Sequence, residues 1–385
     1  MLNVDEACLF GQFYHVNLTP VFFIETLADL EKEIGKGRTP EQVVGSIAYR
    51  TAGMTADANA HHRKLCLSEL LGPRMDTDMG FPAIVGGRPV RVKNRSGLVY
   101  KQSPELDALN RWQNGQFEEV ERRHAKAWRA ALAALDLDAM YRSFRPFVER
   151  IGKPKSYVDA KAIVDTILND PARSEGVLGY AFQTLNVPTE YWGTIFKRWQ
   201  DEGSPPFPQF APYAAHVLGV ELFYAISVGS DLISKDRPSH RADLAYLYYL
   251  PFCMVFVSHD KLHAKTARLF MRQNQVFVWG GEMKEDMRRL DAHYSALPEE
   301  IREQGVMRFA SDPPDDMTYL TTRLHEQFLP GWRKRHDTKT PPESADKLIR
   351  EVREAAEAPT AAEDVPIDDA AFVLFERRIP VRMGK

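Results

Sequence analysis

Cysteine is scarce in this chain. Only Cys8, Cys66 and Cys253 occur among its 385 residues, and they form no CxxC pair. A scattered set of odd number argues against a disulfide-stapled secreted domain and against a cysteine-rich zinc module. We therefore expect a reduced compartment and assign the cytoplasm by default.

Targeting and membrane signals are also missing. The first residues do not combine a basic stretch with an apolar one, so we expect no secretory signal. The longest uncharged apolar run, 244–257, is too short to cross a bilayer and contains Pro251. We expect no membrane partner.

Neither acidic nor basic residues are in large excess. The formal net charge of −3 argues against a protein that coats nucleic acid through bulk charge, but it permits a local basic surface. The motifs GxxxxGK[ST], GxSxG and a strand-preceded GxGxxG are absent. The length and a hydrophobic content of 44% nevertheless allow a large core.

The most informative segment that is present runs from Asp243 to Asp260. Its first half predicts a buried helix that begins at Asp243 and ends near Pro251, because proline cannot continue a helix. Its second half, 253–257, is rich in β-branched and aromatic residues and predicts an interior strand. Asp260 then follows the carboxyl end of that strand, where open α/β sheets bind ligands.

The beginning of the chain also combines acids with short apolar segments. Residues 2–9 and 15–18 predict strands, and Thr19-Pro20 predicts the start of a helix at 21–34. Asp5 lies in the first strand and Glu25 on the helix. With Asp243 and Asp260 they make four carboxylates, the ligand type that Mg²⁺ or Mn²⁺ prefers, and a cation would offset their mutual repulsion.

These residues resemble the PIN-like metal-dependent nucleases. The similarity covers 1–34 and 228–290, and rests on an acid on a helix followed by an acid after the next strand. It implies four or five parallel strands between helices, and cleavage of RNA or DNA with Mg²⁺ or Mn²⁺. The catalytic and metal-binding residues would be Asp5, Glu25, Asp243 and Asp260, and RNA is the expected substrate.

The sequence thus predicts an α/β fold with a small parallel sheet in a three-layer α/β/α arrangement. The nuclease core would be discontinuous, comprising 1–34 and 228–335. A mainly helical insertion would occupy 35–227, and 336–385 would hold a linker, a short helix and a tail. An apolar stretch at 371–375 predicts an edge strand or a contact in a homodimer.

Basic residues suggest where a nucleic acid would bind. Between 88 and 101 the chain predicts a hairpin whose cationic side chains would contact phosphates: Arg88, Arg91, Lys93, Arg95 and Lys101. Lys261 and His263 flank Asp260 and would contact a phosphate there. The alternatives are a solvated hairpin and ordinary loop polarity.

Each acid also has a purely structural alternative. Asp243 could cap a helix and Asp260 could occupy a turn. Glu25 could lie on a solvated helix face, and Asp5 could be a strand-edge acid. The chain would then be a catalytically inactive PIN-like module that binds nucleic acid or protein, or a helical scaffold.

Overall fold

The computed structural model is detailed for most of the chain. The residues described are 2–28, 30–48, 56–58, 61–72, 75, 84–85, 88–92, 95–99, 104–118, 120–121, 123, 141–142, 145–146, 148–150, 152–237, 239–333 and 374–375.

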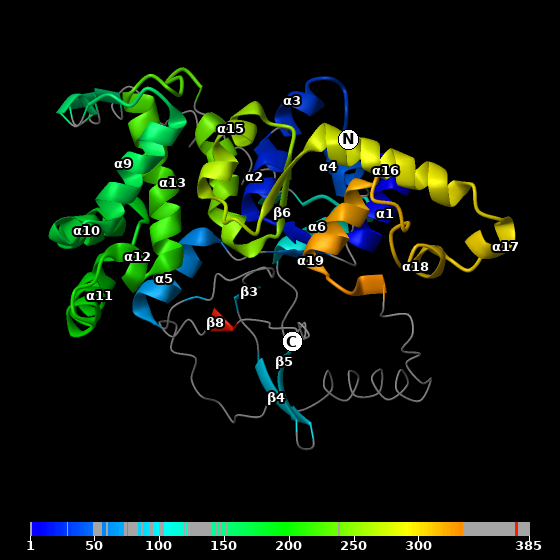
Figure 1. Cartoon of the computed structure of the whole chain (residues 1–385), viewed down its shortest axis with the longest axis horizontal. Helices are drawn as coiled ribbons and strands as arrows, with labels where there is room; N and C mark the ends of the chain where they lie inside the picture. Colours follow the sequence, from blue (N-terminus) through cyan, green and yellow to red (C-terminus); the bar gives the residue numbers. More distant parts are fainter. Residues whose placement is uncertain are drawn as a thin grey trace.

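A helical bundle forms one end of the molecule, at the left of Figure 1. Its central helix is α13 (Pro212–Gly229), which is apolar on every side and therefore almost entirely buried. The helices around it are α5 (His62–Leu71), α9 (Tyr157–Asn169), α10 (Ser174–Thr184), α11 (Thr189–Asp201) and α12 (Phe207–Phe210), with a 3-10 turn, η2 (Pro171–Arg173). Apart from the last two residues of α13, they lie within 35–227, the segment that the sequence predicts to be a mainly helical insertion.

A βαβ unit follows the bundle. Helix α14 (Ser239–Ala245) continues into the 3-10 helix η3 (Tyr246–Phe252), and then come β6 (Val255–Ser258), α15 (Lys261–Phe270) and β7 (Val276–Trp279). The two strands pair in parallel, from Val255 with Val276 to Ser258 with Trp279. Helix α15 is the crossover that this parallel pairing requires. The expected strand, and Asp260 after it, are confirmed.

The expected strand at 2–9 is wrong, because residues Val4–Phe13 form helix α1. The Asn3 side chain accepts the backbone N–H of Glu6 at 2.8 Å, and the Glu6 carboxylate accepts that of Asn3 at 2.7 Å. This reciprocal capping box favours a helix start over a strand. Helix α1 packs against α16 (Gly280–Ser295), near α19 (Leu320–Phe328), at the right of Figure 1.

The expected strand at 15–18 is confirmed as β1 (Val16–Leu18), which pairs in parallel with β2 (Ala56–Ala58). The Asn17 side-chain amide donates to the carbonyl of Phe252 at 3.0 Å, so β1 lies beside the segment that leads into β6. Where the sequence predicts a helix at 21–34, the described residues form α2 (Pro20–Ala28) and α3 (Leu30–Ile34). Helices α4 (Pro40–Ala48) and α6 (Pro104–Gln113) complete this middle region.

The sheet is smaller than the family resemblance implies. Within the described ranges, parallel pairing is confined to β1–β2 and β6–β7, two pairs instead of one sheet of four or five strands. The structure therefore agrees with the α/β class in its coarse form, a small parallel sheet among many helices. None of the described helices is long and apolar enough to cross a membrane.

The expected basic hairpin is formed by β4 (Arg88–Val92) and β5 (Arg95–Val99), which pair antiparallel. Lys93 and Lys101 lie outside the described residues, as do the side chains of Arg88, Arg91 and Arg95. The tail contributes β8 (Leu374–Phe375), an edge strand that pairs with β3 (Ile84–Val85) of the same chain. Two short helices, α17 (Glu299–Arg302) and α18 (Val306–Phe309), precede α19.

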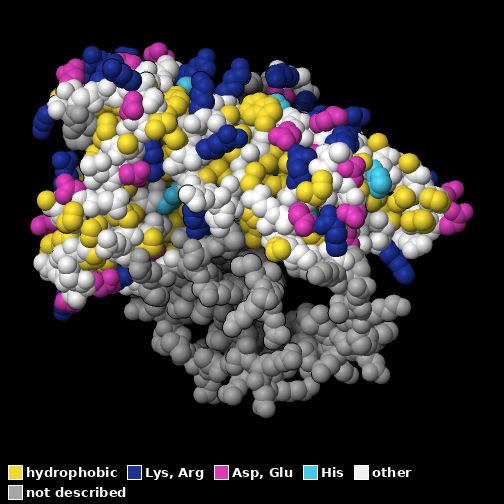
Figure 2. Space-filling model, in the orientation of Figure 1, with side chains coloured by type: hydrophobic (Ala, Val, Ile, Leu, Met, Phe, Trp, Pro, Cys, Tyr) yellow, Lys and Arg dark blue, Asp and Glu magenta, His cyan; other side chains and the backbone are white. Residues whose placement is uncertain are grey.

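The described surface carries both signs of charge. Figure 2 shows Lys and Arg side chains interspersed with Asp and Glu side chains on the face it presents. This mixture agrees with the small net charge of the chain.

Candidate active site

Asp243 lies within electrostatic reach of two other predicted acids, Glu25 and Asp260. Glu25 is on α2, Asp243 is on α14, which contacts α2, and Asp260 connects β6 to α15. The pKa of Asp243 rises to about 7, because burial disfavours its charged form and because Asp260 and Glu25 add repulsion. Segments far apart in the sequence thus bring the charges of Glu25 and Asp260 to bear on Asp243.

The position of Asp243 differs from the prediction. Helix α14 begins at Ser239, so Asp243 lies within the helix and does not cap it. Its half-buried carboxylate accepts no hydrogen bond from any residue that the structure describes. A carboxylate with acidic neighbours and no donor is typical of a site that takes up a cation or a proton.

Asp260 caps a helix with one carboxylate oxygen and leaves the other oxygen available for a ligand. It is the N-cap of α15, where its Oδ1 accepts the backbone N–H groups of Leu262 at 2.6 Å and His263 at 3.0 Å. Oδ2 accepts no hydrogen bond from the described part of the chain. The capping bonds fix the carboxylate, so Oδ2 is preorganised for a ligand.

His263, which the sequence predicts to contact a phosphate, is buried. Its Nε2 lies 2.6 Å from the backbone carbonyl of Asp243 and its Nδ1 lies 2.8 Å from Ser258 Oγ. A carbonyl only accepts, so Nε2 carries the proton and Ser258 donates to Nδ1. Burial lowers the pKa of His263, which agrees with a neutral ring. The other predicted phosphate contact, Lys261, is exposed in the first turn of α15.

Tyr246 is a site residue that the sequence reasoning missed. Its hydroxyl donates to Glu25 Oε2 at 2.6 Å. Burial and the Glu25 carboxylate raise the pKa of Tyr246 far above its ordinary value, so the phenol keeps its proton. The available signal was its spacing: Tyr246 follows Asp243 by three residues, which places both on one side of a helix.

Asp5 is not part of this group. It is exposed in the first turn of α1, and its charge contributes to raising the pKa of Asp291 on α16. Asp5 is separate from the other acids because the capping box makes this segment helical. The expected meeting of four acids is therefore reduced to three.

The three acids are better suited to bind a metal ion that keeps several of its waters than to enclose one with protein ligands alone. Within the described ranges, no three His, Cys, Asp or Glu side chains are arranged to hold one metal ion together. Mg²⁺ usually keeps several waters and binds through one or two carboxylates. The unbonded Asp243 carboxylate and Asp260 Oδ2 fit that requirement, and their oxygen atoms suit a hard cation.

The turn that carries Asp260 is packed tightly against the start of α16. The ring of His259 lies 4.6 Å from that of Trp279, which ends β7. A Cβ atom at Gly280 would lie 2.9 Å from His259 Nδ1. The carboxyl ends of the two strands are thus in direct side-chain contact.

Comparison with family models, with curated proteins and with solved structures finds no match to this chain. A functional assignment therefore depends on the arrangement of Glu25, Asp243 and Asp260.

Proposed function

We propose that this chain is a metal-dependent nuclease that hydrolyses phosphodiester bonds, with RNA as the substrate that its resemblance to PIN-like nucleases implies. Glu25, Asp243 and Asp260 would bind Mg²⁺ or Mn²⁺. The observation that carries the proposal is the half-buried Asp243 carboxylate, whose pKa two other acids help to raise to about 7. Asp5 is excluded from the ligand set because it lies on α1.

The residues of the site divide into ligands and positioning groups. A bound Mg²⁺ or Mn²⁺ would activate a water and neutralise charge on the scissile phosphate. Ionised Asp243 would offer both oxygens, and Asp260 would offer Oδ2 while Oδ1 caps α15. Tyr246 orients Glu25, and His263 fixes the backbone of Asp243.

A test is Mn²⁺-dependent cleavage of a labelled single-stranded RNA. The variants Glu25→Gln, Asp243→Asn and Asp260→Asn keep the shape of each side chain and remove its charge. Each should lose about 100-fold or more in rate, the usual effect of removing one electrostatic group from an active site. Asp165→Asn is the control, because Asp165 is exposed on α9 and pairs with Lys161. Equal rates in wild type and all variants would exclude the proposal.

The second candidate is a catalytically inactive PIN-like module that binds nucleic acid or protein. Two observations favour it: the separation of Asp5 from the other acids, and the lack of a three-residue ligand group within the described ranges. Calorimetric titration with Mn²⁺ separates the two candidates. A nuclease should take up Mn²⁺ in the wild type and not in Asp243→Asn, whereas an inactive module should show no uptake that depends on Asp243.

A further inference from the structure

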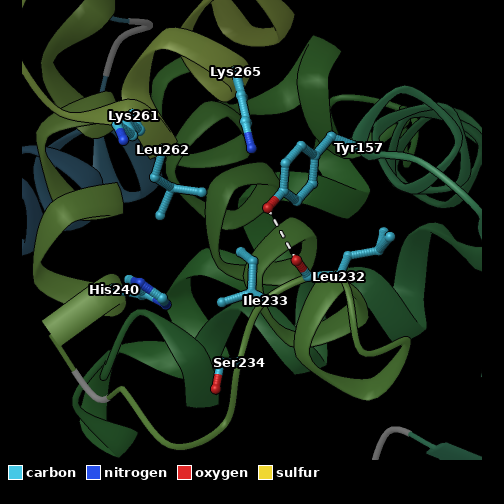
Figure 3. Close-up of a pocket in the computed structure, with 8 residues that line it drawn as sticks. All are labelled: Tyr157, Leu232, Ile233, Ser234, His240, Lys261, Leu262 and Lys265. Carbon is cyan, nitrogen blue, oxygen red and sulfur yellow. Dashed lines mark hydrogen bonds between the residues drawn. The ribbon is translucent and has the colours of Figure 1, made fainter.

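A pocket of about 160 Å³ lies close to Asp260, since its lining includes Lys261, the next residue in the chain. Its walls come from α9, from the segment after α13, from α14 and from the first two turns of α15 (Figure 3). The lining residues that matter here are Tyr157, Ile233, His240, Lys261, Leu262 and Lys265.

The pocket and the acids share structural elements. Lys261 directly follows Asp260, and both belong to the start of α15. His240 is on α14, the helix that carries Asp243. The charge of Asp260 acts on the His240 ring, so the two sites are within electrostatic reach. A ligand in the pocket would lie next to whatever the acids bind.

Every ionisable group of the lining that carries charge at neutral pH is a cation. Lys261 and Lys265 have no ion pair with any described residue, and no acid lines the pocket. In Figure 3 the ammonium group of Lys265 points into the space between Leu262 and Tyr157. The Nδ1 atom of His240 is buried and has no hydrogen-bond partner among the residues that the structure describes. These groups can receive an anion with further polar atoms attached.

The rest of the lining is apolar apart from Ser234 and the Tyr157 hydroxyl. Leu262 and Ile233 face the lysines, and the Tyr157 hydroxyl is occupied because it donates to the carbonyl of Leu232 at 3.0 Å. The Tyr157 ring is therefore held in one orientation and offers a surface on which a flat group can stack. A volume of 160 Å³ has room for about five waters, which suits a single phosphate group, so the rest of a nucleotide would extend out of the pocket.

We infer that this pocket binds one phosphate group of the substrate strand, next to the bond that is cut, with the sugar and base of that nucleotide at the mouth of the pocket. Lys261 and Lys265 hold the phosphate, His240 contacts the sugar, and Tyr157 and Leu262 contact the base or sugar. The inference deepens the proposed nuclease function and rests on it for the origin of the ligand. It requires no metal ion, because the binding groups are the side chains of the pocket itself.

The experiment is a calorimetric titration of the full chain with uridine 5′-monophosphate in EDTA, repeated with uridine 3′-monophosphate, uridine and inorganic phosphate. The wild type should bind a nucleotide more tightly than either uridine or phosphate alone. Lys261→Gln/Lys265→Gln should weaken that binding about tenfold or more, as expected for lost hydrogen bonds to a charged group. Lys284→Gln, an exposed lysine on α16, is the control and should bind like the wild type.

The outcomes separate this inference from the proposed function. Asp243→Asn should abolish RNA cleavage and leave nucleotide binding in EDTA intact. Cleavage by the wild type without nucleotide binding would overturn the pocket and leave the nuclease assignment standing. Equal affinity in the double variant and in Lys284→Gln, or binding of phosphate as tight as that of both nucleotides, would also overturn it. Both lysines are exposed on a helix surface, so the variants should remain folded, which their thermal melting checks.

Discussion

The imidazole of His263 donates a 2.6 Å hydrogen bond to the backbone carbonyl of Asp243. On its other side the ring accepts the Ser258 hydroxyl, whose oxygen in turn accepts the backbone N–H of Asp260 at 3.1 Å. A buried neutral ring therefore connects the helix that carries one acid with the turn that carries the other. The separation of the two carboxylates depends on this connection.

Replacing His263 should accordingly disturb ion binding. His263→Ala removes the bonds to Asp243 and Ser258, so the affinity for Mn²⁺ should fall about 10- to 100-fold, as for other groups that orient metal ligands. His263→Gln, whose amide can both donate and accept, should recover part of the loss. Calorimetry with Mn²⁺ measures both. The exposed His293 provides the control variant His293→Ala, and an unchanged affinity in His263→Ala would contradict the positioning role.

The raised pKa of Asp243 predicts a stability change that depends on pH. Its pKa is about 7 in the folded chain and about 4 in the unfolded chain, so the folded state holds an extra proton between these values. Stability should fall as the pH rises from 4 to 7, because ionisation beside Asp260 and Glu25 is unfavourable. Tyr246 and the neutral His263 bring no positive charge to offset it.

The substitution Asp243→Asn should remove this loss of stability at high pH. Without divalent ions, the variant should be more stable than the wild type by about 1–2 kcal/mol at pH 8, a value reduced for screening because Asp243 is half exposed. The gain should vanish near pH 4. Urea denaturation at both pH values measures it, and an equal effect at the two values would show that the charge of Asp243 is not the cause.

Asp5 should be dispensable for activity. Asp5 lies on α1, away from the three acids. The variant Asp5→Asn should therefore cleave RNA at a rate within about twofold of that of the wild type, as expected for a change outside the site. The pKa of Asp291 should fall, because one repelling charge is lost. A loss of activity as large as that of Asp243→Asn would mean that Asp5 joins the site in the active state.

Asp286 should be a major contributor to stability. This buried carboxylate on α16 accepts the backbone N–H groups of Leu320 at 2.7 Å and Thr321 at 2.8 Å, and so caps α19. Asp286→Ala leaves these donors unpaired and should cost about 2–4 kcal/mol. Glu285→Ala removes an exposed neighbour paired with Arg288 and should change the urea midpoint much less, because exposed ion pairs contribute little to stability. Comparable urea midpoints for the two variants would contradict the capping role.

Local patterns in the sequence predicted the second half of the chain better than its beginning. The β-branched and aromatic run before Asp260 identified strand β6, because interior strands have few alternatives of that length and composition. At the beginning, Val4 and the apolar residues after Asp5 also suit a strand. The side chains of Asn3 and Glu6 decide in favour of a helix.

Other parts of the site could not be predicted from local pattern. Tyr246 meets Glu25 across more than two hundred positions of sequence, and that contact depends on how α2 lies against α14. His263 lies close to Asp260 in sequence, but its burial depends on the carbonyl of Asp243. The size of the sheet likewise depends on which strands pair, and a single strand does not specify its partner.

Gly280 limits which amino acids this turn can tolerate. Only hydrogen fits between its Cα and the ring of His259, so even a methyl group would push His259 outward or displace the start of α16. Because His259 is the residue before Asp260, either adjustment would be transmitted to the carboxylate through a single peptide unit. Gly280 has no functional group of its own, but it thereby controls the orientation of the Asp260 carboxylate.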